Sequence, residues 1–395
     1  MIKIFRKILK IVFTLLSVAI VVIVTLLFAY APEFMFSKVN SVQRDSSIEV
    51  SLEVRSFHDS LFIADLHDDS LAWRYDITRH NQEGHSDIPR LREGGVNVQV
   101  YSAITKTMMN PGPHNDDSSV ITNIQSILQT QPPSTWFSPL GRALYQAEKL
   151  YEFENRSAGT FVVLNSAAKF HDFLSTATAQ DKIGAILSVE GLHALEGNVE
   201  NFDLLYDAGY RLFGMAHFFD NAFAGSAQGL AQNGLTDLGK ELITRGDKRG
   251  VIWDVAHSSN ATIVDLAAQS SSPIIASHTG IKAVCDRDRN LSDEQIRMIA
   301  NHNGLIGIGF WESALCEVRV GNIVRSARHV ADLVGVGHVA LGSDFNGSVR
   351  MPFDASGLPI LTQALLNGGF SENEVRAIMG ENVRRVLLNL VQGYR

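Results

Sequence analysis

Short apolar runs alternate with longer amphipathic segments from Leu61 almost to the end of the chain. Runs of this length are typical of strands that are buried on both faces of a parallel sheet. Several intervening segments, such as 236–250 and 292–304, begin with Ser or Thr and end with Gly, which is the pattern of capped helices. The eight apolar runs are residues 61–65, 96–104, 184–190, 211–217, 250–257, 273–278, 304–310 and 338–344. Eight strands alternating with helices predict an α/β fold, a (β/α)₈ TIM barrel.

One insertion interrupts this alternation after the second predicted strand. Residues 105–160 mix Pro, Asn and Ser with an amphipathic helix near the end of the segment. In a barrel this segment follows a strand and therefore lies at the C-terminal face, where lids and specificity elements occur. A solvated decoration with no role in function is an equal alternative.

The N-terminal segment has a different character. Residues 11–31 carry no charge and are long enough, at 1.5 Å per residue in a helix, to cross a hydrocarbon core of roughly 30 Å. Four basic residues precede the apolar run: Lys3, Arg6, Lys7 and Lys10. This basic flank predicts a cytoplasmic N-terminus and a single-pass anchor, with the rest of the chain extracytoplasmic, in the periplasm if the cell is Gram-negative.

A cleaved signal peptide is the competing interpretation of the same segment, because residues 29–31, "AYA", resemble a small-residue cleavage site. The apolar run exceeds the usual 7–15 residues of a signal sequence, which favours a retained anchor. The predicted organisation is therefore a basic tip and transmembrane anchor at 1–31, a polar linker at 32–55 and one barrel domain at 56–395.

Composition narrows the classes of partner. The 395 residues carry a formal net charge of −8 and are 45% hydrophobic, which is enough for one large packed core. The body of the chain has no Lys/Arg cluster, and nucleic-acid binding needs a concentrated basic surface, so we exclude a nucleic-acid partner. Cys285 and Cys316 are the two cysteines. In an exported domain they indicate one disulfide, with two buried free thiols as the alternative.

Ionisable side chains stand at the ends of six of the eight predicted strands. A single histidine at a strand end is most often a structural residue. In a barrel, however, all the carboxyl ends of the strands meet at one face, where active sites are built. Converging carboxylates and imidazoles are hard to satisfy without a cation. The residues are His67, Asp69, Glu190, His217, His257, His278 and Asp344.

The ligand types indicate which cation this face would bind. Several histidines with two or three carboxylates, and no cysteine nearby in the sequence, suit Zn²⁺ or a similar first-row metal better than Ca²⁺ or Mg²⁺. Five ligands exceed the three that one catalytic zinc usually takes from protein. Two metal ions that share a bridging carboxylate fit this set better.

The ordered set of motifs resembles the membrane dipeptidase (renal dipeptidase) family, metal-dependent barrels of the amidohydrolase type. The likeness covers residues 55–390 and is broken mainly by the insertion. The motifs that carry it are "DLHDD" (65–69), "SVEGLHAL" (188–195), "GVIWDVAHSS" (250–259), "PIIASHTGIKAVCDRDRN" (273–290) and "HVALGSDFNG" (338–347).

The resemblance implies two Zn²⁺ ions per chain. His67 and Asp69 would hold one ion, His257 and His278 would hold the other, and Glu190 would bridge them.

It further implies that His217 polarises the scissile carbonyl, that Arg289 binds the terminal carboxylate of the substrate, and that Asp344 shuttles protons. The cysteines stand where some members of the family have a disulfide, between the loops after the sixth and seventh strands.

Two positions depart from the pattern of the family. Asp68 stands where the family commonly has Asn, and Asn346 stands where the family commonly has Asp. Neither position is a metal ligand in the family, so we expect altered tuning of the site and no loss of metal.

A membrane-anchored zinc dipeptidase is therefore the leading hypothesis for the function. A metal-activated water would hydrolyse the peptide bond, and a pocket that captures both termini would admit only short peptides. Two alternatives remain. The same barrel could hydrolyse another amide or a lactam during maturation of a peptide-like metabolite outside the cytoplasm. It could also be an inactive, membrane-tethered binding protein, since a fold alone does not establish activity. Assembly as a homodimer is left open.

Overall fold

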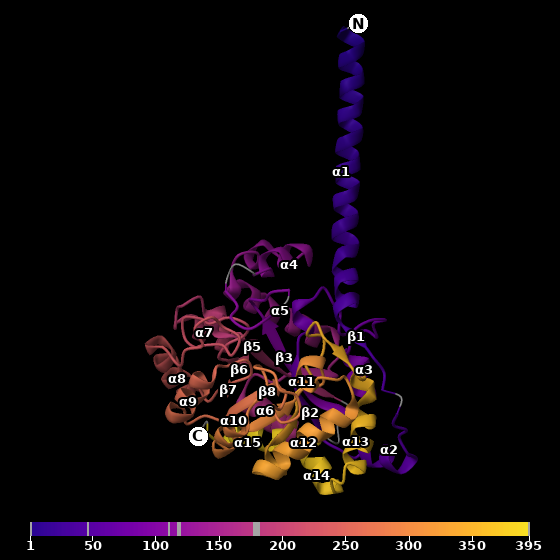
Figure 1. Ribbon diagram of the computed structural model, residues 1–395. Helices are drawn as coiled ribbons and strands as arrows, with labels where there is room; N and C mark the ends of the chain where they lie inside the picture. Colours follow the sequence, from indigo (N-terminus) through magenta and orange to yellow (C-terminus); the bar gives the residue numbers. More distant parts are fainter. Residues whose placement is uncertain (1, 46, 110, 117–119, 177–181, 394–395) are drawn as a thin grey trace.

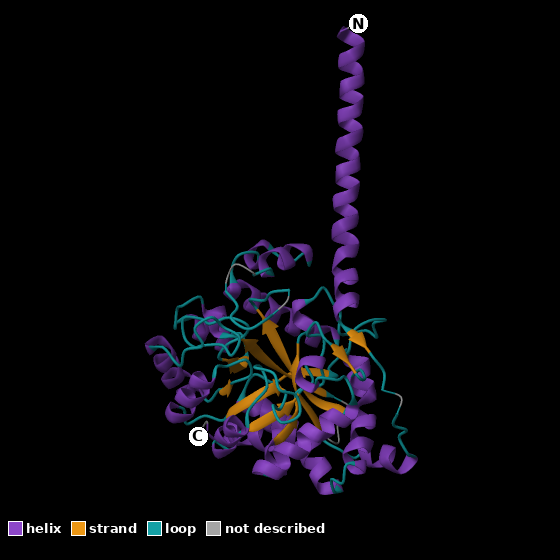
Figure 2. Cartoon of the chain, in the orientation of Figure 1, coloured by secondary structure: helices purple, strands orange, loops and turns teal. Residues whose placement is uncertain are grey.

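Eight parallel strands close into a barrel in the computed structural model, which describes residues 2–45, 47–109, 111–116, 120–176 and 182–393. The order of neighbours is β3-β2-β10-β9-β8-β7-β6-β5, and pairing of β3 with β5, from Val98↔Gly184 to Ile104↔Glu190, closes the ring. Figures 1 and 2 show this barrel with helices around it. The predicted TIM-barrel fold is confirmed. The barrel strands are β2 (Ile63–Asp68), β3 (Val96–Ile104), β5 (Ile183–Glu190), β6 (Tyr210–Gly214), β7 (Ile252–Asp254), β8 (Ile274–Thr279), β9 (Leu305–Ile308) and β10 (Val339–Leu341).

α8 (Asp237–Arg249) and α10 (Asp293–Asn301) begin at the Thr and Ser caps that the sequence predicted. α8 is also capped at its end by the predicted glycine, whereas α10 is capped by His302, two residues before Gly304. Thr236 Oγ1 accepts a hydrogen bond from the Gly239 amide at 3.1 Å, and Ser292 forms a capping box with Gln295. Gly250 ends α8 with a φ of 66°, which glycine adopts without strain. The surrounding helices are α3 (Ile88–Glu93), α5 (Pro139–Arg156), α7 (Asn201–Asp207), α8 (Asp237–Arg249), α9 (Asn260–Gln269), α10 (Asp293–Asn301), α11 (Glu312–Leu315), α12 (Val320–Val334), α13 (Leu358–Asn367) and α14 (Glu372–Arg376).

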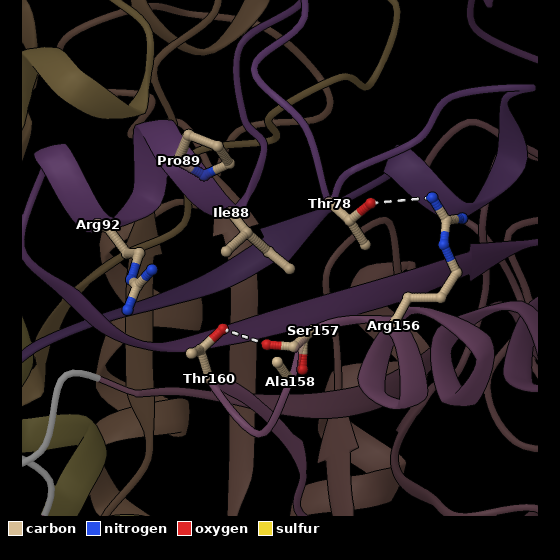
Figure 3. A pocket seen from close by; sticks show the side chains of 8 residues that line it. All are labelled: Thr78, Ile88, Pro89, Arg92, Arg156, Ser157, Ala158 and Thr160. Atoms are coloured by element: carbon tan, nitrogen blue, oxygen red, sulfur yellow. Dashed lines mark hydrogen bonds between the residues drawn. The ribbon is translucent and has the colours of Figure 1, made fainter.

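The insertion after β3 contains α4 (Thr122–Leu128) and the long helix α5, and it leads into a further strand, β4 (Phe161–Val163), which the apolar pattern did not single out. β4 pairs in parallel with residues 183–185 of β5, whereas β6 pairs with residues 187–189 of the same strand. β4 therefore pairs with the first residues of β5, and β6 pairs with the residues that follow them. A hollow beside it is lined by residues of α3, the end of α5 and the turn before β4 (Figure 3).

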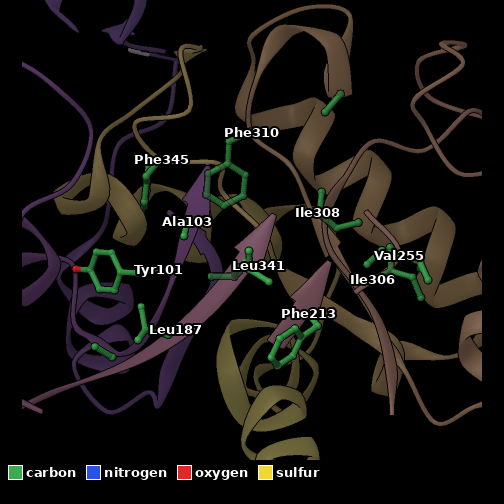
Figure 4. Close-up of a cluster of buried hydrophobic side chains, with 14 of the residues drawn as sticks. Tyr101, Ala103, Leu187, Phe213, Val255, Ile306, Ile308, Phe310, Leu341 and Phe345 are labelled. Carbon is green, nitrogen blue, oxygen red and sulfur yellow. The ribbon is translucent and has the colours of Figure 1, made fainter. Parts of the chain in front are cut away.

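Two apolar clusters pack against the strands, one outside the barrel and one inside it. The larger lies between the sheet and the outer helices, and part of it is drawn in Figure 4. The smaller takes residues from all eight barrel strands, which can meet only in the barrel interior: Ala64, Val98, Ile186, Leu212, Ile252, Ile275, Leu305 and Ala340. Side chains of α6 (Ala167–Thr176) and α15 (Asn382–Gly393) join this cluster. Because most of the strand residues lie near the strand starts, these helices close the N-terminal end and leave the carboxyl ends for the site.

The N-terminal helix α1 runs without a break from Ile2 to Val39, beyond the apolar run. By length and composition it is a candidate membrane span. Strand β1 (Ser41–Val42) follows and pairs in parallel with β11 (Arg350–Met351), which lies after β10. The segment 32–55 thus contains helix and strand, and it includes the start of α2 (Leu52–His58).

The two cysteines form a disulfide. Cys285 lies in the loop after β8 and Cys316 lies just after α11, with their Cα atoms 5.4 Å apart. The bridge therefore joins the loops that follow two neighbouring strands of the barrel, β8 and β9.

Candidate metal centre

Glu190, the last residue of β5, lies among four imidazole rings at the carboxyl ends of the strands. Its Oε1 atom is 3.1 Å from His257 Nε2, 3.4 Å from His278 Nε2 and 3.7 Å from His67 Nε2. Its Oε2 atom is 3.5 Å from His217 Nε2. One carboxylate therefore reaches residues contributed by four different parts of the barrel.

Asp69 and the histidines lie close to one another around Glu190. Asp69 Oδ1 is 3.2 Å from His67 Nε2, and both side chains are buried. His257 and His278 have their Nε2 atoms 3.1 Å apart, and the rings of His67 and His278 have centroids 3.7 Å apart. The five residues predicted as metal ligands thus come together in one cluster.

Several polar atoms at this centre are buried and have no hydrogen-bond partner within the described residues. They are His67 Nε2, Asp69 Oδ1 and Glu190 Oε2. Buried polar atoms without partners cost about 1–3 kcal/mol each unless another group satisfies them. A cation coordinated by nitrogen and carboxylate oxygen would satisfy all three, so these residues fit a divalent metal of the Zn²⁺ class.

The protein groups alone leave an excess of negative charge here. Burial raises the pKa of Glu190 to about 8, and the Asp69 carboxylate adds to this effect. Burial alone would lower the pKa of His67, but the carboxylates of Asp69, Glu190 and Asp344 outweigh it and raise the value to about 10. The centre therefore holds positive charge strongly, first in the form of protons, which metal ions would displace on binding.

Ser277 and Asp254 orient two of the histidines, and sequence reasoning missed both. Ser277 Oγ donates to Asp254 Oδ2 at 2.6 Å, so its lone pairs face His278 Nδ1 at 2.9 Å and His67 Nδ1 at 3.3 Å. Both Nδ1 atoms then carry the proton, and both Nε2 lone pairs point to the centre. Hydrogen bonds of this kind fix the tautomer of metal-binding histidines. The signal in the sequence was an Asp inside the apolar run 250–257.

His217 is held by a backbone carbonyl. Its Nδ1 atom donates to the Lys106 carbonyl oxygen at 3.1 Å, so its Nε2 atom faces Glu190 without a proton in the neutral ring. Burial lowers the pKa of His217 well below its usual value, and neighbouring His193 adds to this effect. The ring of His193 stacks on that of His217 with centroids 6.5 Å apart, and neither of its nitrogens has a hydrogen-bond partner among the described residues.

Asp344 lies in the loop after β10, and one of its carboxylate oxygens lies within 4.8 Å of ring nitrogens of His67 and His278. A Cβ atom on Gly347 would lie 2.0 Å from Asp344 Oδ1 and 2.9 Å from Asp69 Oδ2, so only glycine lets this backbone approach both carboxylates. Burial, and then the Asp69 charge, raise the pKa of Asp344 well above its usual value. Asp344 and His257 have φ values of 65° and 64°, which are uncommon for residues other than glycine and cluster at functional sites.

Arg289 lies at the mouth of the centre, in the loop after β8. Its Nη2 atom donates to the His278 carbonyl oxygen at 2.7 Å, and its Nη1 atom donates to Thr279 Oγ1 at 3.3 Å. Its Nε atom has no hydrogen-bond partner within the described residues. Burial lowers the pKa of Arg289 to about 10, while the charge of Asp344 opposes this effect, so the guanidinium stays positive at neutral pH. This arrangement differs from a surface salt bridge, in which a carboxylate would neutralise the group.

The remaining carboxylates of the first motif have partners of their own. Asp65 accepts hydrogen bonds from Gln99 and from Ser343. Asp68 accepts from the Ser70 amide at 2.7 Å and from the Ser86 hydroxyl.

Asn346 contacts the same two serines as Asp68. Its Nδ2 atom donates to Ser70 Oγ at 2.7 Å and to Ser86 Oγ at 3.1 Å. The two positions that depart from the family pattern therefore share one hydrogen-bond network.

The hollow of Figure 3 contains none of these side chains. Arg156 donates to Thr78 at 3.1 Å across it, and to Asp76, and Thr160 donates to the Ser157 carbonyl. Its lining is Thr78, Ile88, Pro89, Arg92, Arg156, Ser157, Ala158 and Thr160. The candidate site is therefore the cluster at the carboxyl ends of the strands.

Comparisons with known proteins give the relatives of this chain. Residues 51–392 match the family model described as membrane dipeptidase (peptidase family M19). The dipeptidase aclJ of Aspergillus oryzae is 26% identical over 326 residues, which cover 80% of this chain and 72% of that protein.

Solved structures share the fold. A metallopeptidase from Rhodobacter sphaeroides, bound to a phosphinate mimic of the dipeptide L-Ala-D-Ala, has a TM-score of 0.67 and 24% identity over 83% of this chain and 99% of that chain. The probable dipeptidase PvdM of Pseudomonas aeruginosa has a TM-score of 0.71 and 19% identity over 86% of this chain and 98% of that chain. Because the family model covers most of the chain, the protein belongs to the membrane dipeptidase family, peptidase family M19, and is a metallopeptidase that hydrolyses dipeptides.

Proposed function

We propose that the protein is a membrane-anchored dipeptidase whose barrel holds two Zn²⁺ ions. His67 and Asp69 would bind one ion, His257 and His278 the other, and Glu190 both. The observation that supports this proposal best is the position of Glu190 Oε1, within 3.7 Å of three imidazole Nε2 atoms. When bound, the ions would supply a water of lowered pKa and positive charge beside the substrate carbonyl.

Asp344 would move the protons in this reaction. It lies beside Asp69, and burial with the Asp69 charge raises its pKa well above the usual value, which favours a carboxyl group that accepts a proton. Asp344 would take a proton from the attacking water and deliver it to the departing amine.

Arg289 and His217 would position the dipeptide. The uncompensated guanidinium of Arg289 suits the terminal carboxylate of a short peptide, with which it would form a charge-assisted pair. His217 would stabilise the negative charge that develops on the carbonyl oxygen. Because its pKa is lowered, His217 is neutral, and donation to that oxygen would require its one proton to sit on Nε2 in place of Nδ1.

The anchor places this chemistry outside the cytoplasm. The basic residues ahead of the apolar run of α1 would stay in the cytoplasm, and the barrel would lie on the opposite side of the membrane. Protease protection of the barrel in sealed spheroplasts or vesicles tests this orientation.

The mechanistic test compares metal content with turnover in matched variants. Glu190→Gln should lose both metal and activity, whereas Asp344→Asn should retain metal and lose at least about 100-fold in kcat. Glu200→Gln, an exposed glutamate, serves as the control and should change neither. Full metal content in Glu190→Gln would refute the bridging role, and normal turnover in Asp344→Asn would refute the proton shuttle.

Substrate length gives an independent test. Dipeptides with a free carboxylate should be hydrolysed, and the corresponding carboxamides should have a much higher KM. In Arg289→Met this difference in KM between the free and the amidated dipeptide should disappear. Equal KM values for the free and blocked peptides would show that Arg289 does not bind the terminus.

A further inference from the structure

The last turns of α1 pack against the barrel domain. Phe28, Pro32 and Phe36 recur every four residues and therefore lie on one face of the helix. Pro32 and Phe36 are buried, and Phe28 is half-buried. The ring of Phe36 lies 5.3 Å from that of Trp73 and 4.5 Å from that of Tyr75. The anchor is thus seated on the domain along one helix face.

Arg74 adds a polar contact that depends on the proline. Pro32 has no amide hydrogen, so the carbonyl of Phe28, four residues earlier, lacks its helical donor. Arg74 Nη1 donates to that oxygen at 3.0 Å, and Arg74 Nη2 donates to the Ala29 carbonyl at 3.3 Å. Both acceptors precede Ala31, so the contact exists only if the apolar helix stays attached to the domain. This favours a retained anchor over a cleaved signal peptide.

These contacts place α1 at the catalytic face of the barrel. Trp73 and Arg74 follow β2, and Asn40, at the end of α1, accepts a hydrogen bond from the Ser348 amide in the loop after β10. Both loops leave the carboxyl ends of strands, where the candidate metal centre lies. Figure 1 shows α1 leaving the domain on the side that carries α4, and α4 contacts α1. Because Arg74 contacts Phe28 and Ala29, the catalytic face of the barrel lies at the height of the last turn of the apolar run 11–31.

Large apolar side chains are exposed on the same face. Four stand in the segments that follow β3 and β6: Met109 (75% exposed), Ile124 on α4 (63%), Phe137 (74%) and Leu230 (65%). The two segments are joined where the Asn115 amide donates to the Gln228 carbonyl at 2.8 Å. We call these four side chains the apolar rim. Single exposed apolar residues are ordinary, but a group of large ones beside a membrane span matches the composition of an interfacial surface.

We propose that the apolar rim rests on the lipid bilayer that α1 crosses, so that the barrel presents its catalytic face to the membrane surface. This inference rests on the proposed role of α1 as an anchor. The occupant is the bilayer because α4, which carries Ile124, contacts α1, and because Arg74 holds the domain at the residues where the apolar span ends. The seated helix and the Arg74 contact would hold the domain in this orientation instead of letting it swing on a linker.

Spin-label accessibility in the full-length chain tests the proposal. Single labels are attached at Ile124→Cys, Phe137→Cys and Leu230→Cys, with the native disulfide kept, and each protein is reconstituted into phosphatidylcholine vesicles. Leu52→Cys is the matched control, because Leu52 is 88% exposed and lies on α2, which is remote from α1 in Figure 1. Power-saturation EPR compares collisions with oxygen, which concentrates in lipid, and with a water-soluble nickel chelate.

The rim labels should shift toward oxygen relative to the label at residue 52, and hydrolysis of a soluble dipeptide should be unchanged in all four proteins. Rim labels as accessible to the nickel chelate as the control, in protein that floats with the vesicles, would overturn the bilayer contact and leave the anchor intact. Protein that does not float with the vesicles would overturn the anchor as well. Neither outcome would affect the dipeptidase assay, which tests the proposed chemistry separately.

Discussion

Asp68 and Asn346 should be energetically coupled, because both form hydrogen bonds with Ser70 and Ser86. Asp68 accepts from the Ser70 amide and the Ser86 hydroxyl, and Asn346 donates to both hydroxyl groups. Ser86 donates to Asp68, and its lone pairs accept from Asn346 Nδ2 at 3.1 Å. Asn346 Oδ1 also accepts from the His85 amide at 2.8 Å. The network joins the loop that carries Asp69 to the loop that carries Asp344, so it should influence the spacing of these two carboxylates.

Each single exchange leaves a mismatched group in this network. In Asp68→Asn, the amide of residue 68 turns a donor toward either the Ser70 amide or the Ser86 hydroxyl proton, which should cost about 1–3 kcal/mol of unfolding free energy. In Asn346→Asp, a second buried carboxylate faces the Ser86 carbonyl oxygen, which now accepts from Asn346 at 3.3 Å. This change should cost at least as much, because the Ser86 carbonyl oxygen loses its donor and faces a buried negative charge instead.

The double exchange, Asp68→Asn with Asn346→Asp, restores a consistent network. Residue 68 would then donate to Ser86, whose hydroxyl proton would turn toward residue 346. The backbone amide of Ser70 would still find an oxygen at residue 68. The double variant should recover about 1–3 kcal/mol relative to the sum of the single changes. Metal affinity should follow the same order, with a loss of about 10-fold or more in each single variant and partial recovery in the double variant.

Urea denaturation of the four proteins, with and without added zinc, measures the coupling directly. Competition with a chromophoric chelator gives the metal affinities. Additive single effects, within about 0.5 kcal/mol, would show that the two side chains do not act through the shared serines and would refute this reasoning.

Three further predictions address other parts of the domain. Gly347→Ala would place a methyl carbon 2.0 Å from Asp344 Oδ1 and should reduce kcat by about 100-fold, whereas Gly321→Ala, which meets no atom within 4 Å, should leave kcat unchanged; steady-state kinetics compares them. Replacing the Cys285–Cys316 disulfide, whose partners are 31 residues apart, by two serines should lower the unfolding free energy by about 4 kcal/mol, measured by denaturation; an unchanged midpoint would contradict this. Burial lowers the pKa of His85 to about 4, so stability that is fully present above pH 6.5 should fall as pH decreases toward 4, by about 3 kcal/mol, and His85→Gln should flatten the profile.

The barrel and the convergence of its site were predictable because both follow from local patterns. Each strand is a short apolar run, and parallel strands must present their carboxyl ends on one face. This geometry brings residues as distant as His67 and Asp344 together without any knowledge of side-chain packing. It does not settle which of them touch metal.

The missed features depend on contacts between segments that have no pattern of their own. β4 and β1 are too short for periodicity to reveal, and they exist because the edges of β5 and β11 are available to them. The support that Ser277 gives to two histidines depends on a serine that also lies within an apolar strand. The contact of α1 with the domain joins Phe28, Pro32 and Arg74. The boundaries drawn from composition place these residues in the anchor, the linker and the barrel, so they gave no sign of the contact.

The three carboxylates of the first motif, Asp65, Asp68 and Asp69, can be close in sequence because their side chains point in different directions and have different partners. β2 changes register between Asp65 and Asp68, so successive acidic residues leave the strand in different directions. Asp65 is satisfied by Ser343 and Gln99, and Asp68 is satisfied by serines. Asp69 alone keeps a buried oxygen without a donor, 3.2 Å from His67 Nε2. Of the three acidic residues, Asp69 is therefore the one with a carboxylate available to a metal ion. Asp65 and Asp68 hold the backbone around Asp69 in place through their hydrogen bonds.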